Sequence, residues 1–223
     1  MTRALIAVAA VLAAACAPLP TEHDGLSFTE RRLRLESVPA WEMRGRLTVD
    51  TGERAFQGRF HWLQDEDRLS LSVRNFLGGG ILDVTGSPTE MVVSVRGEQR
   101  VLEDPERDLS ELLGWWMPVD SLQAWLLGLP DPDFAAEPRI GQGGLLRSLE
   151  QRLWNLEYEA YQLSGGVLVP RRFEMTHGPI ELRLTVDAWL PAGATSRALN
   201  SAAPEQHNTA LGGVKGRWGV AKR

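Results

Sequence analysis

Cysteine is nearly absent from this sequence, since Cys16 is the only one among 223 residues. A lone cysteine excludes an intrachain disulfide, and it excludes a zinc site built from cysteine pairs. Lysine is almost as rare, because Lys215 and Lys222 are the only two and all other basic side chains are arginines. We attach no chemistry to this arginine bias, and we expect the fold to depend on a hydrophobic core.

Sequence patterns typical of enzymes are also missing. The histidines are scattered and form no His-Glu-x-x-His pattern (His23, His61, His177 and His207). Ser87 lies in Gly-Ser-Pro and lacks the Gly-x-Ser-x-Gly elbow of hydrolases, and glycines 78–80 are not followed by the Lys-Ser or Lys-Thr of a phosphate loop. Asp131 and Asp133 lie in a proline-rich stretch, which predicts solvated charges. We infer that the protein is not an enzyme and uses no metal or cofactor.

No apolar run is long enough to span a bilayer, which takes about 20 residues. The run over residues 4–15 follows a short basic start and ends directly before Cys16, so residues 1–15 are predicted to be a secretory signal. The pattern resembles a bacterial lipoprotein signal, although Ala13 stands where leucine is usual. This resemblance implies lipid attachment at Cys16, and Ala17 after it implies the outer membrane. The alternative is ordinary cleavage after a small residue, which would release a soluble periplasmic protein.

Basic charge is scarce outside the C-terminal end. The formal net charge is −5, while residues 195–223 hold five basic side chains against Glu205 alone. A nucleic-acid binder needs a basic face, so no nucleic-acid partner is predicted.

The length fits one domain over residues 26–190 after a tether over residues 16–25, and we expect the protein to be a monomer. Residues 191–223 have few apolar anchors and are predicted to be a disordered tail.

The apolar pattern of the body alternates with a period of two, which predicts antiparallel strands. The predicted strands cover residues 41–50, 56–62, 69–74, 81–84, 91–95, 99–102, 145–150, 154–161, 167–176 and 180–189. Helices are predicted over residues 28–38, from the capping box of Ser27 and Glu30, and over residues 105–113 and 120–127 between the two strand groups. The fold class is therefore mainly β with short helices. We expect a strongly curved antiparallel sheet covered by helices, with a closed barrel as the neighbouring possibility.

The connection between two of the predicted strands carries Phe76 and Leu77 directly before three glycines. Turns normally carry Gly, Asn, Asp and Pro, so two large apolar residues are unusual there. Leaving each side chain in water forgoes about 1.5 to 3 kcal/mol. Either the loop folds back and buries them, or they form a hydrophobic tip for an environment other than water.

Several large apolar residues share one face of the predicted sheet or lie on the inserted helix. They are Phe60, Trp62, Leu71, Leu82, Trp125 and Leu182. Periodicity places them inside, but it does not distinguish a solid core from the wall of an apolar cavity. Both interpretations stay open at this point.

The ordered set of local motifs resembles the LolB family of outer-membrane lipoprotein receptors. The motifs follow the lipoprotein-like cysteine in this order: Arg44-Gly45, Phe60-x-Trp62-x-Gln64, residues 71–75 leading into Leu77-Gly78, Ser121-Leu122-Gln123 through Trp125, Leu127-Gly128-Leu129-Pro130, and Asp187-Ala188-Trp189. The resemblance runs from Cys16 to about Leu190. Phe76 stands where proline is common in the family, and the long tail after Leu190 is a second departure.

This resemblance implies an incomplete antiparallel barrel whose helical lid encloses an apolar, acyl-chain cavity. It implies that the protein accepts acylated lipoprotein cargo from a LolA-like periplasmic carrier and inserts it into outer-membrane lipid. The family's membrane-insertion leucine matches Leu77, beside Phe76. We hypothesise that the helices over residues 105–113 and 120–127 part to admit acyl chains.

Two rival functions remain on the residues alone. One is a scaffold lipoprotein with a solid core, whose exposed loop binds a protein partner. The other is a soluble periplasmic carrier of hydrophobic ligands. A hydrophobic dye would separate the first from a receptor, and the state of Cys16 would separate the second.

Overall fold

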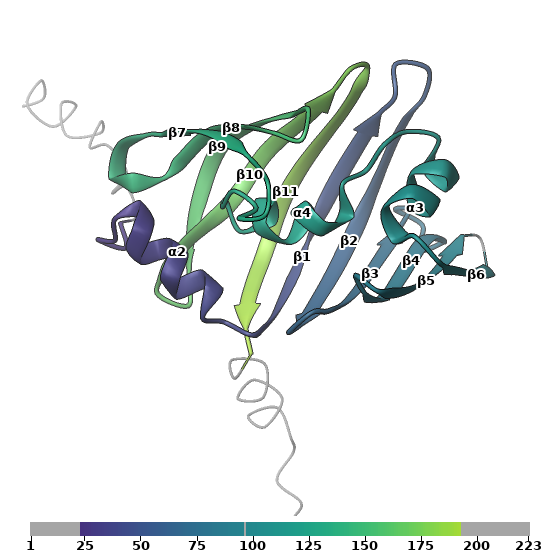
Figure 1. Cartoon of the computed structure of the whole chain (residues 1–223), viewed down its shortest axis with the longest axis horizontal. Helices are drawn as coiled ribbons and strands as arrows, with labels where there is room; N and C mark the ends of the chain where they lie inside the picture. Colours follow the sequence, from purple (N-terminus) through teal and green to yellow (C-terminus); the bar gives the residue numbers. More distant parts are fainter. Residues whose placement is uncertain (1–22, 96, 193–223) are drawn as a thin grey trace, which may run out of the picture.

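The structure is a computed structural model that describes residues 23–95 and 97–192, and its centre is one eleven-stranded antiparallel sheet (Figure 1). The strands are β1 (Ala40–Asp50), β2 (Ala55–Asp65), β3 (Arg68–Arg74), β4 (Gly80–Ser87), β5 (Glu90–Val95), β6 (Glu98–Leu102), β7 (Ala136–Ile140), β8 (Leu146–Gln151), β9 (Trp154–Ser164), β10 (Val167–His177) and β11 (Ile180–Pro191). The helices are α2 (Phe28–Glu36), α3 (Pro105–Leu113) and α4 (Val119–Leu126), with a short 3-10 helix η2 (Gln142–Gly144).

The sheet is an incomplete barrel. Its strand order is β6-β5-β4-β3-β2-β1-β11-β10-β9-β8-β7, so the last strand returns to pair with the first. Strands β6 and β7 form the two edges and are not paired with each other, and the chain passes from one edge to the other through α3 and α4. The predicted fold class, a curved antiparallel sheet with short helices, is confirmed, and the sheet is open.

Helices α3 and α4 lie in front of the sheet in Figure 1. Helix α3 begins as its sequence predicts, because the Asp104 side chain accepts a hydrogen bond from the N–H of Arg107 and Pro105 takes the first helical position. It ends at Gly114, whose φ of 78° is the left-handed conformation that glycine adopts at low cost. The core lies between these helices and the sheet, and Trp125, Trp154 and Phe173 are fully buried there.

Helix α2 and the residues before it are packed against the β10 side of the sheet. Its capping box is present, since Ser27 accepts from the N–H of Glu30 and the Glu30 carboxylate accepts from the N–H of Ser27. The Asp24 side chain is 2% exposed and forms an ion pair of 2.7 Å with Arg31. Asp24 also accepts from the N–H of Leu168 in β10 at 2.9 Å. The last part of the expected tether is therefore held against the domain.

Two features differ from the sequence-based expectation. Strand β7 was not predicted, because its sequence, Ala-Glu-Pro-Arg-Ile, is polar and contains Pro138, which edge strands tolerate. The prediction that Asp131 is solvated is wrong. Asp131 is 6% exposed, and its carboxylate accepts hydrogen bonds from Ser121 and from the N–H of Asp133.

The expected signal, the lipid-attachment residue Cys16 and almost all of the expected tail lie outside the described residues. Within residues 23–95 and 97–192, no helix has the length and apolar character that a membrane crossing requires.

Candidate functional site

An apolar cavity of about 270 Å³ lies between the sheet and the two helices. The six residues singled out from the sequence all line it: Phe60 and Trp62 from β2, Leu71 from β3, Leu82 from β4, Trp125 from α4 and Leu182 from β11. The other lining residues include Val49, Ile81, Leu113, Trp115 and Met117. The space is therefore not a solid core, and its wall comes from both halves of the chain.

Alternation along each strand builds this wall. In β2 the side chains of Phe60 and Trp62 are buried while Arg59 and Leu63 are exposed, as a period of two requires. Glycine makes room for the Phe60 ring on the neighbouring strand, since a Cβ atom at Gly45 would lie 2.7 Å from it. That atom would also clash with the carbonyl oxygen of Thr185 in β11, so neither neighbouring strand leaves room for a larger residue at Gly45.

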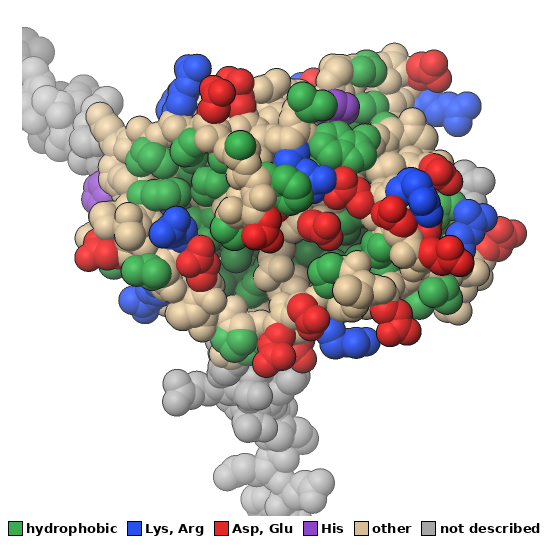
Figure 2. All heavy atoms as spheres, viewed as in Figure 1, with side chains coloured by type: hydrophobic (Ala, Val, Ile, Leu, Met, Phe, Trp, Pro, Cys, Tyr) green, Lys and Arg blue, Asp and Glu red, His purple; other side chains and the backbone are tan. Residues whose placement is uncertain are grey.

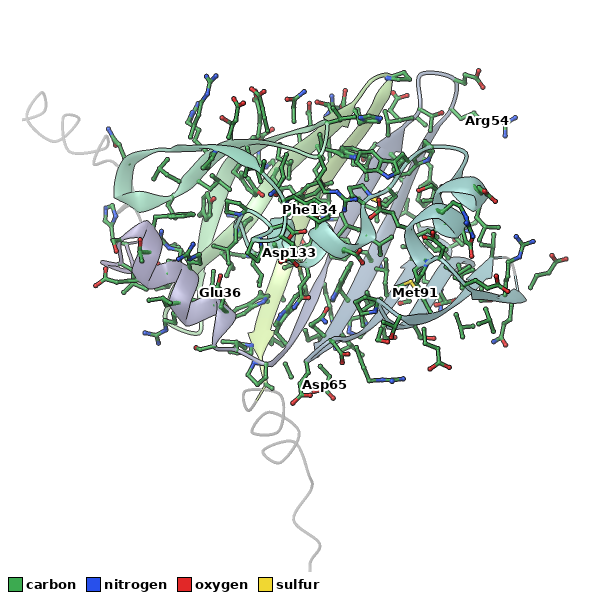
Figure 3. The ribbon with its side chains drawn as sticks, viewed as in Figure 1. Glu36, Arg54, Asp65, Met91, Asp133 and Phe134 are labelled. Atoms are coloured by element: carbon green, nitrogen blue, oxygen red, sulfur yellow. The ribbon has the colours of Figure 1, made fainter. Side chains whose placement is uncertain are left out.

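Polar groups reach the cavity at one place. Among its lining residues only Thr51 and Arg54 are polar or charged, and both belong to the connection between β1 and β2. Figure 3 shows Arg54 at the upper edge of the molecule, directed away from the ribbon. We infer that the cavity meets solvent beside this connection, next to Leu113 and Trp115 at the end of α3.

Helix α4 is fixed to the sheet by a buried polar network. The Trp125 Nε1–H donates to Oε1 of Gln151 at 2.8 Å, and the Tyr158 hydroxyl donates to the Trp125 carbonyl at 2.9 Å. Gln151 also binds the backbone of Asp131 in both directions, and Asp131 accepts from the Ser121 hydroxyl at 2.6 Å. Breaking such a network would leave several buried groups unsatisfied.

Helix α3 is held differently, mainly by one side chain from the turn between β8 and β9. Arg152 donates to both carboxylate oxygens of Glu106, at 2.6 and 2.9 Å. Its guanidinium lies 4.0 Å from the Phe134 ring centre and 5.3 Å from that of Trp116. In Figure 3, Phe134 lies on the helix-covered side of the sheet. Only Leu109 of α3 is fully buried, so α3 is the more weakly anchored of the two helices.

The Arg152 turn was not identified from the sequence. Arg152 and Leu153 have φ values of 50° and 60°, so both adopt the left-handed conformation of a type I′ hairpin. Asn-Gly is usual at these two positions, and an arginine and a leucine there are strained. The short connection over residues 151–153, which has no glycine or asparagine and joins two predicted strands, is the signal that could have marked this site.

The loop over residues 75–79 presents Phe76 and Leu77 to solvent. Leu77 is 98% exposed and Phe76 is 53% exposed, so the loop does not fold back to bury them. The Asn75 side chain accepts hydrogen bonds from the N–H groups of Leu77 and Gly79, both at 2.9 Å. Gly78 has a φ of 87°, which suits glycine alone. The tip is thus apolar and exposed, and hydrogen bonds to the Asn75 side chain fix its shape.

The pKa of Asp120 is raised, first by burial and then by the nearby Glu106 carboxylate. In the described part of the chain, no three His, Cys, Asp or Glu side chains gather in a way that suits a metal ion. The arrangement can sequester an apolar ligand, and it offers an exposed apolar contact.

Comparisons with the sequences of known proteins point to one family. The family described as "Outer membrane lipoprotein LolB" matches residues 39–189. The outer-membrane lipoprotein LolB of Stutzerimonas stutzeri is 30% identical over 189 residues, which cover 82% of this chain and 92% of the relative. The protein of the same name from Nitrosococcus oceani is 28% identical, with 83% and 95% covered.

Among solved structures, a LolA superfamily protein from Nitrosomonas europaea is similar to this chain with a TM-score of 0.48 and 8% identity. The similarity covers 74% of this chain and 94% of that one.

Proposed function

The chain belongs to the outer membrane lipoprotein LolB family, and on this premise we propose that it is a lipoprotein receptor of the outer membrane. It accepts acylated proteins from a LolA-like periplasmic carrier and inserts them into membrane lipid, without catalysing a reaction. The observation that carries the proposal is an apolar cavity whose wall is joined directly to an exposed apolar tip. Ile81 lines the cavity, and Leu77, only four residues earlier, is 98% exposed.

The cavity is suited to acyl chains because its lining is almost entirely apolar. Each methylene group buried there contributes about 0.8 kcal/mol, so a single acyl chain gains several kcal/mol on entry. The present volume of about 270 Å³ is small beside ligand pockets, which hold roughly 300 to 1,000 Å³. The cavity must therefore widen when cargo enters.

Helix α3 is the element that moves in this proposal. Leu113 and Trp115, at the end of α3, line the cavity and lie beside its polar rim. Helix α4 keeps its place because Trp125 is bound to Gln151 and Tyr158. Opening would separate Glu106 from Arg152, which are 13–20% exposed, and would leave the buried network of α4 intact.

The tip acts at the delivery step. Acyl chains leaving the cavity past Ile81 lie close to Phe76 and Leu77, which enter the lipid and carry the chains with them. Transfer needs no nucleotide if affinity for cargo rises from the carrier to this protein and from this protein to the membrane. Acylated Cys16 anchors the mature chain through its tether, since stable anchoring takes more than one acyl chain.

The test uses the chain from Ala17 onward, which retains every residue that the structure describes. It is mixed with a carrier preloaded with a labelled lipoprotein, and then with liposomes. Label should move to this protein and then to the vesicles. If no label moves although circular dichroism shows a folded protein, the scaffold function replaces the receptor function.

Two variants separate acceptance from delivery. Leu77→Glu should accept cargo normally and deliver at least tenfold less of it, whereas Leu82→Trp should fill the cavity and lower acceptance itself. The matched control is Leu153→Glu, because Leu153 is 81% exposed but lies in the turn between β8 and β9. Equal loss of both steps in Leu77→Glu would refute the assigned role of the tip.

A further inference from the structure

Three arginines lie side by side on the outer face of the sheet, directly below the tip. Arg46 of β1 pairs in register with Arg59 of β2, and Arg59 pairs in register with Arg74 of β3. Their side chains point away from the cavity, because the neighbouring Phe60 and Val73 point inward. Directly paired residues have Cβ atoms about 4.5 to 5.5 Å apart, and like charges at such positions repel.

The middle arginine is not compensated. Arg46 forms an ion pair with Asp187 at 2.9 Å, and Arg74 forms one with Asp83 at 2.6 Å. No ion pair or side-chain hydrogen bond joins Arg59 to any residue in the described ranges. Arg59 is exposed, so an anion from outside the protein can reach it. The row therefore lacks a negative partner at its centre.

The tip lies among these arginines. Phe76 borders two surface hollows, one of about 590 Å³ that includes Arg44, Arg59 and Arg74, and one of about 280 Å³ that includes Arg46, Arg172 and Arg183. The only acidic residues lining the two hollows are Asp187 and Glu159. Arginines other than Arg59 do have carboxylate partners, but most of these pairs are exposed, so water and salt screen them and each contributes little to stability. They can exchange a carboxylate for another anion at little cost.

We propose that this outer face is a docking surface for the phosphate groups of anionic membrane lipids, with Arg59 as its central contact. The proposal rests on the proposed function, in which Phe76 and Leu77 enter the membrane. Guanidinium groups bind phosphate through paired N–H donors, and Arg59 has its donors free of protein partners. Because the arginines surround the base of the tip, they reach the headgroup layer when the tip reaches the acyl chains.

A membrane surface explains both the unpaired Arg59 and the exposed Leu77. A free phosphate ion or an acidic peptide would satisfy Arg59, but neither gives a reason for a leucine that is 98% exposed beside it. Lipid offers an apolar layer and an anionic layer at neighbouring depths. The chain as a whole carries a formal net charge of −5, so attraction to an anionic surface must come from a local feature such as this one.

The test measures binding of the chain from Ala17 onward to vesicles, where the acyl anchor does not contribute. Vesicles of phosphatidylcholine are compared with vesicles that also contain phosphatidylglycerol. Arg59→Gln should weaken binding to the anionic vesicles about fivefold and leave binding to the neutral vesicles unchanged. Arg59→Glu should weaken the first more strongly, and the difference should shrink as salt is added.

The matched control is Arg68→Gln. Arg68 lies on the same strand and the same face as Arg74 and is exposed, but it is six residues away from it, at roughly 20 Å. Its removal should change vesicle binding less than twofold. Arg59→Gln and Arg68→Gln with equal affinities would overturn the proposal.

Leu77→Glu distinguishes this proposal from the proposed function. If Leu77→Glu weakens binding to both kinds of vesicle while Arg59→Gln weakens neither, the tip enters the membrane and the phosphate surface is refuted. If Arg59→Gln weakens anionic binding and Leu77→Glu still delivers cargo normally, the phosphate surface is supported and the role of the tip in delivery fails.

Discussion

The lid segment and the surroundings of the tip carry opposite charges. Residues 103–120, which contain α3, hold six acidic side chains and one arginine, Arg107. Acidic side chains spread over the helix-covered face in Figure 2. The two hollows beside Phe76, on the outer face, are lined by six arginines and two acids. An anionic membrane would attract the tip side and repel the lid side. In the proposed function, this charge difference turns the tip toward the membrane and the lid away from it.

The two regions also differ in how they are held. Helix α3 depends on Arg152, a residue from a distant turn, and its release changes no strand pairing. The tip depends on Asn75 within the same loop, and its backbone is fixed whether or not the rest of the molecule moves. A moving lid and a fixed tip suit a protein in which the cavity changes shape while the membrane contact stays constant.

The largest expected effect comes from removing the ion pair that holds α3. Arg152→Ala should lower the free energy of unfolding by about 3 kcal/mol, because it leaves the partly buried Glu106 carboxylate without its cation. Urea unfolding measures this loss, and a hydrophobic dye should bind more strongly as α3 opens. The control is Arg107→Ala on the same helix, because the Arg107 side chain is 60% exposed and solvent screens its ion pairs, so a much smaller loss is expected. Equal losses in both variants would show that Arg152 does not hold α3.

A third region, the Asp24–Arg31 ion pair, should make the free energy of unfolding depend on pH in acid. Burial alone raises the pKa of Asp24, but hydrogen bonds from Arg31 and from the N–H groups of Leu168 and Leu26 outweigh it and lower the pKa from 3.8 to about 2. A lowered pKa in the folded state contributes stability that is complete above the unfolded value and disappears as pH falls through the folded one. Between about pH 4 and pH 2 the free energy of unfolding should fall by about 2 kcal/mol from this group.

Comparison with Asp24→Asn isolates that contribution. The variant should be less stable than the parent at pH 7 and should lose less stability on acidification, as measured by urea unfolding at each pH. A parallel pH dependence in the two proteins would show that Asp24 is not the source of the acid sensitivity.

The smallest expected effect concerns the tip. Asn75→Ala removes the acceptor of two backbone N–H groups and should lower the free energy of unfolding by about 1 kcal/mol. Leu77→Glu should change it by less than about 0.5 kcal/mol, because Leu77 packs against nothing. Cargo delivery should fall in both variants. Normal delivery by a correctly folded Asn75→Ala protein would show that the fixed shape of the tip is not needed.

Local patterns predicted most of the fold. Alternation gave ten of the eleven strands, and the capping signals of Ser27 and Asp104 gave the starts of α2 and α3. The same alternation placed Phe60, Trp62 and Leu71 on one face, and that face lines the cavity. Each of these features depends on neighbours within a few residues, which a single sequence displays.

The remaining features depend on partners far away in the chain. Asp131 is buried because Gln151 and Ser121 satisfy it, and Arg152 holds α3 through Glu106, 46 residues earlier. Strand β7 exists because β8 offers it a partner, although its own residues favour a loop. The difference between a fixed α4 and a weakly held α3 follows from these contacts, so periodicity did not reveal it.

The unpaired edges of the sheet allow the wall of the cavity to widen. A closed barrel has a circumference set by its strand number and shear, so swelling it would break inter-strand hydrogen bonds. Here β6 and β7 are not bonded to each other, and the seam between them can spread while every strand pair stays intact. The edge residues Glu98 and Arg100 of β6 and Pro138 of β7 discourage pairing with another chain. In the proposed function, the cavity can thus widen around cargo of different sizes and narrow again after release, while the strand pairing of the sheet is kept.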